Sequence, residues 1–380
     1  MRALRGPTVS APDPQAPRRE LTQPGRVLAA LQSSLEEAFA WLCRQRRYWP
    51  DDTDVWEFRR SWPAEKRAIL RDLRSDRYRF SLLTKVATAS GETAHVWAAR
   101  DAAVLKALTI ALGSVLPVST RCAHVKGHGG LKGAVRDAVQ ALPEHRFVFR
   151  TDVKSYYDSI DPGALIERLK RHIGDERIVG LVRQYLYRTS ERGGVFTTFE
   201  KGISRGCPLS PLMGAFFLGD LDARMERQAA RDRLFYVRYM DDILVLAPTR
   251  WKLRRAVGTI NAELASLGLE QHPGKTFVGR ISRGFDFLGH HLSHDGVGKV
   301  RLGLAANTVA SFKTKLSRLY EQGRSAKATP SGRRALEARM SIYIRRWCSR
   351  VRGGGLWDGT ASQPSANNRT GDRGARVAVE

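Results

Sequence analysis

Three aspartates occupy positions where a carboxylate is costly unless something binds it. Asp152 closes an alternating apolar run, and Asp241 and Asp242 interrupt a second apolar stretch further along the chain. Buried or converging carboxylates need solvent, a partner or a cation. A hard divalent ion such as Mg²⁺ suits them, and a pair of such ions supports in-line phosphoryl transfer. The alternative is a solvated turn at Asp241-Asp242, with Asp152 at a helix start or a sheet edge.

The elements that must position these acids are short strands. Residues 146–153 (RFVFRTDV) alternate and are rich in Phe and Val, which predicts a strand. The runs FYVRYM and ILVLA flank Asp241-Asp242 and predict a hairpin with both aspartates at its turn. Residues 284–292 predict another short strand pair. Asp161-Pro162 and Ser210-Pro211 each predict a helix start, with a capping side chain followed by proline.

Helices are predicted on either side of this strand region. Apolar residues recur at helical spacing over 28–42, over 104–115 (ending at Pro117), and over 309–319 and 336–347. The mixture indicates an α+β core with a helical C-terminal subdomain. Residues 1–25 and 358–380 are polar and carry many Pro, Gly or Asn residues, which predicts a disordered leader and a disordered tail.

The chain is strongly basic. Its 380 residues carry 64 Lys+Arg against 38 Asp+Glu, a formal net charge of +26, and 42% hydrophobic residues exclude a wholly disordered chain. Such a surplus indicates a polyanionic partner held through counterion release, or else an arginine-rich solvated surface. Neither a signal peptide nor a run of ~18–20 apolar residues is present, so we expect a cytoplasmic protein without membrane contact. Four scattered cysteines without a CxxC pair exclude a disulfide framework.

Several segments resemble, in the correct order, the motifs of bacterial reverse transcriptases of the group II intron and retron type. They are DVKSYYD (152–158), GISRGCPLSP (202–211), YMDD (239–242), GKT (274–276) and GFDFLG (284–289). The resemblance covers roughly residues 75–350. It implies an α+β right-hand polymerase fold with fingers, a palm made of an antiparallel sheet plus helices, and a helical thumb. The implied divisions are an N-terminal extension and fingers over 26–145, a palm with some fingers elements over 146–295, and a thumb over 296–357.

The resemblance also implies roles for the motif residues. Asp152 and Asp241 would share two Mg²⁺ ions (Mn²⁺ being a substitute), assisted by the carbonyl of Val153, with Asp242 more peripheral. Tyr157 would lie under the incoming sugar and favour deoxynucleotides, or else be a core aromatic. Lys275 would reach the departing pyrophosphate as a proton donor or a charge clamp.

The remaining implied contacts are basic or glycine positions. Many relatives have Gln where this chain has Arg205, and Arg cannot accept a hydrogen bond, so template positioning is the step this departure affects. Arg100, Arg205 and Gly206 are expected beside the nucleotide. Residues 126–133 are interpreted as a fingers loop that contacts template or triphosphate, or as a flexible connection. The thumb is expected to pack its apolar side on the palm and lay its cations along a duplex. The residues expected at template and primer are Lys126, Lys132, Arg136, Lys313, Arg345 and Arg346.

The leading hypothesis is an RNA-directed DNA polymerase that extends a 3′-OH. Its partners would be an RNA template, a DNA or RNA primer, deoxynucleoside triphosphates and a cognate non-coding RNA. One alternative is an RNA-holding palm-fold protein of a phage-defence or mobile-element system, and another is a template-independent nucleotide-adding enzyme. Aromatic residues alternate with arginines near the N-terminus, and we expect them either to stack on bases or to anchor a helical extension. The biological role (intron mobility, retron synthesis, CRISPR association or phage defence) and the oligomeric state stay open.

Overall fold

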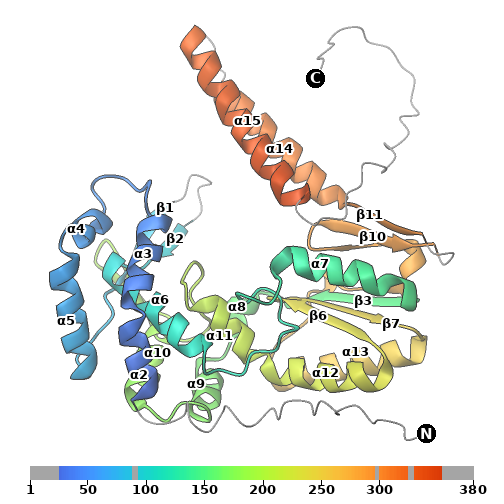
Figure 1. The fold of residues 1–380 in the computed structure, drawn as a ribbon, viewed down its shortest axis with the longest axis horizontal. Coiled ribbons are helices and arrows are strands. Elements are labelled where there is room, and N and C mark those ends of the chain that lie inside the picture. Colours follow the sequence, from blue (N-terminus) through green and yellow to red (C-terminus); the bar gives the residue numbers. More distant parts are fainter. Residues whose placement is uncertain (1–24, 88–92, 296–298, 324–328, 353–380) are drawn as a thin grey trace, which may run out of the picture.

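The computed structural model describes residues 25–87, 93–295, 299–323 and 329–352 (Figure 1). The predicted tail and the predicted leader, apart from Gly25, lie outside these residues. The strands are β1 (Leu83–Ala87), β2 (Thr93–Val96), β3 (Phe147–Asp152), β4 (Thr189–Arg192), β5 (Val195–Thr198), β6 (Phe235–Tyr239), β7 (Asp242–Ala247), β8 (Phe277–Arg280), β9 (Phe285–Phe287), β10 (His290–His294) and β11 (Val300–Leu304). The α-helices are α2 (Arg26–Ser33), α3 (Leu35–Gln45), α4 (Asp54–Arg60), α5 (Trp62–Arg74), α6 (Ala99–Gly113), α7 (Gly130–Ala141), α8 (Tyr156–Ser159), α9 (Pro162–Lys170), α10 (Glu176–Leu186), α11 (Ser210–Phe217), α12 (Gly219–Asp232), α13 (Arg250–Ser266), α14 (Ala306–Gln322) and α15 (Pro330–Arg352).

The strands expected to carry the acids form one antiparallel sheet in the order β6-β7-β3-β8, here called the central sheet. The predicted strand and hairpin are both confirmed. One detail of the hairpin was wrong. The two-residue turn is Met240-Asp241, because Tyr239 pairs with Asp242 and Asp242 is already the first residue of β7. The predicted strand pair near residue 284 is confirmed as β9 and β10, which with β11 make a three-stranded sheet.

Side chains alternate between the two faces of the central sheet, so each face has its own core. Phe149 and Val245 belong to the larger cluster, which includes residues of α13. Val148 and Leu244 belong to a second cluster, with residues of α7, β9 and β10. Figure 1 shows α12 and α13 on one side of the sheet and α7 with β10 and β11 on the other.

Helix α7 corrects one expectation. The loop expected over 126–133 ends at Gly129, the N-cap of the helix, so Lys132 lies in the first turn of α7 and Arg136 one turn later. Helix α7 packs on β6 and shares its core with the central sheet, because its apolar residues Ala134, Val135 and Ala138 face Val237 and its neighbours. The assignment of these residues to the fingers stays a prediction.

The N-terminal helices surround α6, whose buried residues occupy nearly all its sides. Such an all-round apolar helix is interior rather than amphipathic. It ends at Gly113, short of the expected stop at Pro117. A second four-stranded sheet has the order β2-β1-β4-β5, in which β1 and β4 run parallel.

Helices α14 and α15 pack on each other and extend away from β10 and β11 as a two-helix arm (Figure 1). The ring of Phe312 stacks on Trp347, with ring centroids 4.1 Å apart, and on Tyr343 at 5.5 Å. No described residue of α14 is buried. The expectation that the apolar stripe packs on the palm was therefore wrong, since the two stripes mainly cover each other. Within the described ranges, the structure contains no helix long and apolar enough to cross a membrane.

Candidate active site

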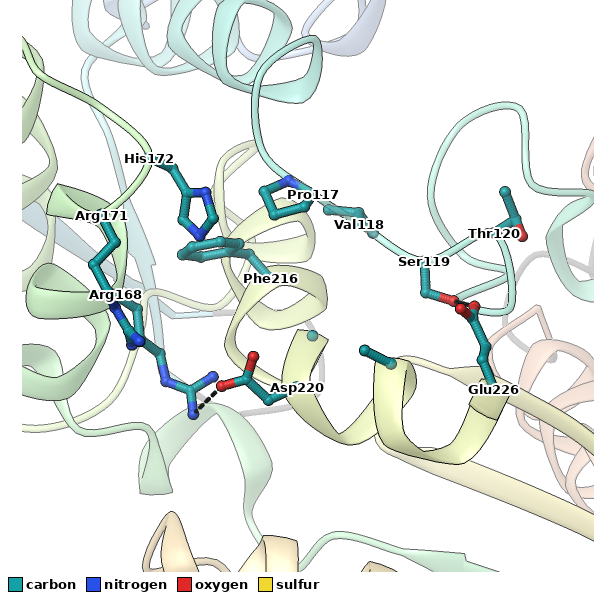
Figure 2. A pocket seen from close by; sticks show the side chains of 12 residues that line it. Pro117, Val118, Ser119, Thr120, Arg168, Arg171, His172, Phe216, Asp220 and Glu226 are labelled. Carbon is teal, nitrogen blue, oxygen red and sulfur yellow. Dashed lines mark hydrogen bonds and ion pairs between the residues drawn. The ribbon is translucent and has the colours of Figure 1, made fainter. Parts of the chain in front are cut away.

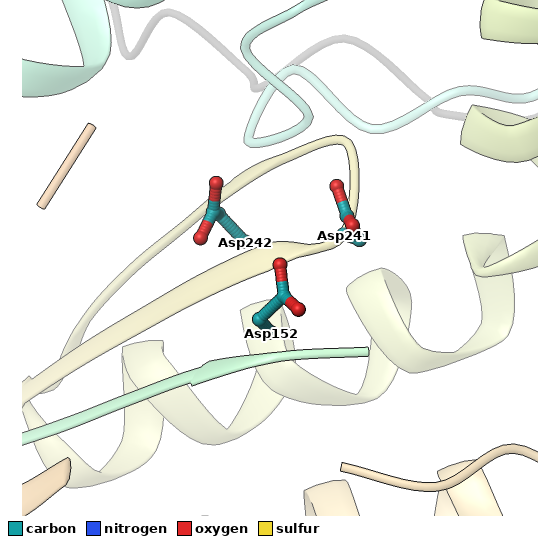
Figure 3. A group of neighbouring side chains, drawn as sticks. All are labelled: Asp152, Asp241 and Asp242. Atoms are coloured by element: carbon teal, nitrogen blue, oxygen red, sulfur yellow. The ribbon is translucent and has the colours of Figure 1, made fainter. Parts of the chain in front are cut away.

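The structure brings the three aspartates to one end of the central sheet (Figure 3). Asp152 ends β3, Asp242 begins β7 directly opposite it, and Asp241 lies in the adjoining turn. One carboxylate oxygen from each residue lies within 4.8 Å of the other two. In the part of the chain that the structure describes, this is the one group of three or more acidic, His or Cys side chains close enough to share an ion. The donor set consists of carboxylate oxygens alone, which fits a hard divalent cation.

The three carboxylates repel one another, so the cluster is stabilised by a positive charge placed beside it. Burial, reinforced by the charges of Asp241 and Asp152, raises the pKa of Asp242 to about 6. Burial and the neighbouring Asp152 also raise the pKa of Asp241. Lys275 balances part of this negative charge, since its Nζ lies 2.9 Å from Asp152 Oδ2. That hydrogen bond raises the pKa of Lys275. The role expected for Lys275, contact with a departing pyrophosphate, stays a prediction.

The backbone of the turn that carries Asp241 is held by two side chains, His124 and the buried Arg238. Met240 has φ 57°, a left-handed conformation that L residues rarely adopt and that persists only when the surroundings enforce it. Its N–H donates to His124 Nδ1 at 2.9 Å, and its carbonyl accepts from Arg238 Nη1 at 2.7 Å. Both backbone polar groups of the strained residue are thus fixed, which positions Asp241.

Arg238 and its partner Asp222 are both fully buried, each with 0% of its side chain exposed. Arg238 Nε donates to Asp222 Oδ1 at 2.8 Å, Nη2 pairs with Asp222 Oδ2, and Tyr236 donates its hydroxyl to the same carboxylate at 2.6 Å. Burial opposes the charge of Arg238, but the Asp222 carboxylate outweighs it and holds the pKa of Arg238 well above its ordinary value. Nη2 also donates to Ala215 O at 3.0 Å, which ties the hairpin to α11.

His124 serves the turn as a neutral imidazole. Its Nδ1 accepts from Met240, so its Nε2 carries the proton and donates to Pro211 O at 3.0 Å. Burial lowers the pKa of His124 from 6.5 to about 4. Protonating Nδ1 would replace an acceptor by a second donor facing the Met240 N–H, which is why the folded chain resists it.

The His124 contact predicts a pH dependence of stability. Between pH 6.5 and about 4 the unfolded chain binds a proton at His124 that the folded chain does not. The free energy of unfolding therefore falls as the pH drops through this window, by about 3 kcal/mol in total. We expect His124→Gln to flatten this part of the profile, measured by urea unfolding from about pH 7 down to about pH 4.5. Parallel profiles for the two proteins would contradict the assignment.

Tyr157 follows Asp152 through a tight turn at Ser155, where φ is 47°. Its ring lies against Gly214, where an added Cβ would sit 3.2 Å from Tyr157 Cε1 and 3.3 Å from Tyr156 Cε1. Gly202 is needed for the same packing, because a Cβ there would meet Tyr157 O at 2.7 Å. Tyr156 is buried and donates to Gly214 O at 2.6 Å, as expected for a core residue.

In the described residues, the predicted nucleotide contacts Arg100, Arg205 and Gly206 form no ion pair or hydrogen bond with the three aspartates. The guanidinium of Arg100 is held by α5, at 2.9 Å from Asp72 Oδ2 and 3.2 Å from Glu65 Oε2. Arg205 pairs with Asp158, and Gly206 adopts φ 78° with open space around its Cα.

The predicted template and primer residues are exposed. Within the described ranges, none of them forms an ion pair or hydrogen bond with the three aspartates, so their roles stay predictions. Lys126 lies in a loop and forms an ion pair with Glu37. Lys132 and Arg136 lie on helix α7, and Lys313, Arg345 and Arg346 lie on the two-helix arm.

The sequence interpretation missed the side chains that hold the turn, which are Arg238, Asp222 and His124. One signal was present, because Arg238 is a cation in the middle of the apolar run FYVRYM, and buried charges are almost always paired. Arg150 was missed as well. It donates to Asp286 O at 2.8 Å and Lys275 O at 3.2 Å, so it fixes the segment that carries Lys275.

An antiparallel sheet that gathers three carboxylates at a hairpin turn, next to a lysine, has the chemistry of a nucleotidyltransferase site. Residues 106–292, just under half of the chain, match the family model for reverse transcriptase (RNA-dependent DNA polymerase).

A curated relative, the protein YkfC of Escherichia coli (strain K12), is 26% identical over 182 residues. The match covers 39% of this chain and 47% of the relative, so the chain spans about half the length of that protein. Among solved structures, the apo telomerase of Candida Tropicalis truncated from its C-terminal domain aligns with a TM-score of 0.37 and 16% identity, over 44% of this chain and 39% of that chain.

Proposed function

We propose that this protein is an RNA-directed DNA polymerase that extends a 3′-OH with deoxynucleotides on an RNA template. The observation that carries the proposal is the convergence of Asp152, Asp241 and Asp242 within the residues that match the reverse transcriptase family model. In this proposal the central sheet is the palm, α6 and the sheet β2-β1-β4-β5 belong to the fingers, and the two-helix arm is the thumb. Its basic surface would hold the nucleic acid through phosphate contacts.

Two Mg²⁺ ions, replaceable by Mn²⁺, would be held by Asp152 and Asp241, with the carbonyl of Val153 and the more peripheral Asp242 nearby. When bound, such ions activate the attacking hydroxyl and stabilise the leaving oxygen. The chain itself supplies orientation. The hydrogen bonds to the Met240 backbone position the Asp241 carboxylate. Lys275, half exposed beside Asp152, can turn its ammonium towards a departing phosphate.

A cavity of about 800 Å³, whose lining includes Arg205, would admit the template. Aromatic and basic side chains share its wall, and stacking on aromatic faces holds unpaired bases regardless of sequence. The wall residues of these kinds are Trp41, Arg46, Trp49, His95, Trp97, Arg188, Phe199, Lys201 and Arg205. Arg46 is already stacked on Trp49, 4.2 Å from the ring centroid, so part of this wall is rigid before anything binds.

The proposal is tested by primer extension with the full chain. A DNA primer on an RNA template, Mg²⁺ and deoxynucleoside triphosphates should give template-length DNA, and a chelator should stop the reaction. Omitting the template, and then replacing deoxynucleotides by ribonucleotides, separates this activity from template-independent addition and from RNA synthesis. Absence of DNA under all primer and metal conditions, from protein that binds RNA, would favour the RNA-holding alternative.

Tyr157 is proposed to exclude the ribose 2′-OH. Its ring is wedged at Gly214, and its hydroxyl is buried without a hydrogen-bond partner among the described residues. We therefore expect Tyr157→Ala to raise the relative efficiency of ribonucleotide incorporation by about 10- to 100-fold. The measurement is kcat/KM for matched ribo- and deoxynucleotides. Tyr157→Phe is the control and should stay close to the parent protein, whereas equal discrimination by the Ala variant would refute the role.

A further inference from the structure

A cavity of about 850 Å³ lies between helix α13 and the edge strand β8, and arginines dominate its polar lining. Four of them contribute, and no acidic residue does. They are Arg250 and Arg254 of α13, Arg280 at the end of β8, and Arg283 just after it. All four are exposed. We call this feature the arginine pocket.

The arginine end of the pocket lies away from the active site, since Arg280 pairs with Phe147 and Arg250 follows the end of β7. Phe147, which lines it, is five residues before Asp152 on β3, about 17 Å along an extended strand. Residues 147 and 152 also point to opposite faces of the sheet, because side chains alternate along a strand. Phe147 accordingly packs with the larger core on the α13 side, whereas Asp152 shares its face with Val148.

The positive charge of the arginine pocket is not balanced by acidic side chains of the described residues. Across the described ranges, no carboxylate forms an ion pair with any of its four arginines. The cavity of about 430 Å³ shown in Figure 2 is a useful contrast, because there Arg168 pairs with Asp220 at 3.0 Å and Glu226 accepts from Ser119. Nearby, Arg255 is likewise satisfied, by Asp232 at 2.7 Å. The four arginines therefore differ from Arg168 and Arg255, whose charges are balanced by neighbouring acids.

The start of α13 adds a second reason to expect an anion. Its first turn contains Arg250 and Lys252 and no acidic residue. Cations at a helix N-terminus oppose the helix dipole, whereas a phosphate there is stabilised. Trp251 stands beside them with 74% of its side chain exposed, and the guanidinium of Arg254 lies 5.5 Å from its ring centroid.

We propose that the arginine pocket binds the phosphate backbone of a folded RNA outside the copying site, with Trp251 stacking on an unpaired base. Arginines recognise phosphates through paired N–H donors, and folded RNAs are recognised through backbone contacts together with stacked, unpaired bases. A phosphopeptide would satisfy the arginines but gives no use for an exposed indole beside them. This inference rests on the proposed function only in taking nucleic acid as the partner, since it concerns a second site.

The test measures RNA binding to the full chain while the active site is occupied. The chain is saturated with a short primed template, and a labelled blunt-ended RNA hairpin is titrated by fluorescence anisotropy at several salt concentrations. We expect the hairpin to bind without displacing the primed template. Arg254→Gln with Arg280→Gln should weaken hairpin binding about tenfold and lower the log–log salt slope by about 2. Trp251→Ala should weaken binding without changing the slope.

Controls separate this site from general charge. Arg67→Gln with Arg183→Gln removes two exposed arginines from α5 and α10 and should leave the slope unchanged. The pocket variants should extend the short primed template at the parent rate. Hairpin binding can be measured even if the chain has no polymerase activity, so failure of the proposed function is distinguishable from failure of this proposal. The proposal is overturned if the hairpin competes fully with the primed template, if the pocket variants bind it like the parent, or if a phosphoserine peptide binds the pocket more tightly than RNA.

Discussion

Asp241→Asn should abolish primer extension, lowering the rate by about 10³-fold or more, while RNA affinity stays within about twofold. The amide removes the negative charge that a cation needs and keeps the shape of the side chain. The same change should not unfold the protein. Burial and Asp152 already raise the pKa of Asp241, so its charge is a burden on the fold, and a neutral residue relieves it.

The diagnostic result is therefore lost activity with an unchanged or slightly raised melting temperature. Gel-based extension, filter binding and thermal denaturation measure the three quantities on one preparation. Asp51→Asn, which neutralises an exposed acid near the N-terminal helices, is the matched control and should keep full activity. Extension by the Asp241 variant at more than about a tenth of the parent rate would remove the carboxylate cluster from the chemistry.

Asp222→Asn should be the most destabilising conservative change in the domain. It leaves the fully buried charge of Arg238 without its counter-charge, which typically costs about 3–5 kcal/mol. A fall of roughly 10 °C in melting temperature is expected. Glu57→Gln, which breaks an exposed ion pair with Arg60, should cost less than about 0.5 kcal/mol. A shift of under about 2 °C for Asp222→Asn would show that the pair matters little to the fold.

A double replacement separates stability from the positioning of Asp241. Changing Arg238 to Met and Asp222 to Leu removes both charges, and apolar replacement of a buried pair is often neutral for stability. However, the Met240 carbonyl then loses its donor. We expect the melting temperature to recover while extension stays at least about tenfold below the parent. Recovery of both would mean that Arg238 acts on stability alone.

Local pattern was enough to predict the strands and turns that carry the acids. Residues 146–153 alternate, and two apolar runs separated by turn residues specify a hairpin whatever surrounds them. Asp161 also caps α9 as expected, accepting from the Ala164 N–H at 2.6 Å. Ser210 does not cap its helix, since it lies inside α11 and donates to the carbonyl of Ser204. Its partner is set by how a loop folds back, which cap statistics do not describe.

The side chains that hold the Met240-Asp241 turn could not be predicted from local sequence pattern. Arg238, Asp222 and His124 come from three separate segments, and only tertiary packing brings them around Met240. Helix α7 was misassigned for a related reason, because Gly127, Gly129, Gly130 and Gly133 suggest a loop while the apolar residues that follow need the central sheet to cover them. Long-range burial decided both outcomes.

The sparse anchoring of α14 has a mechanical consequence. The helix has 17 residues, about 25 Å in length, and none of its described residues is buried. Pivoting it by roughly 20° about Ala305 moves its far end about 9 Å while the stacked rings of Phe312, Tyr343 and Trp347 stay together. The pair can therefore tilt about the end of β11 without repacking of a core, and under the proposed function such a tilt would accommodate nucleic-acid helices of different width, A-form or B-form.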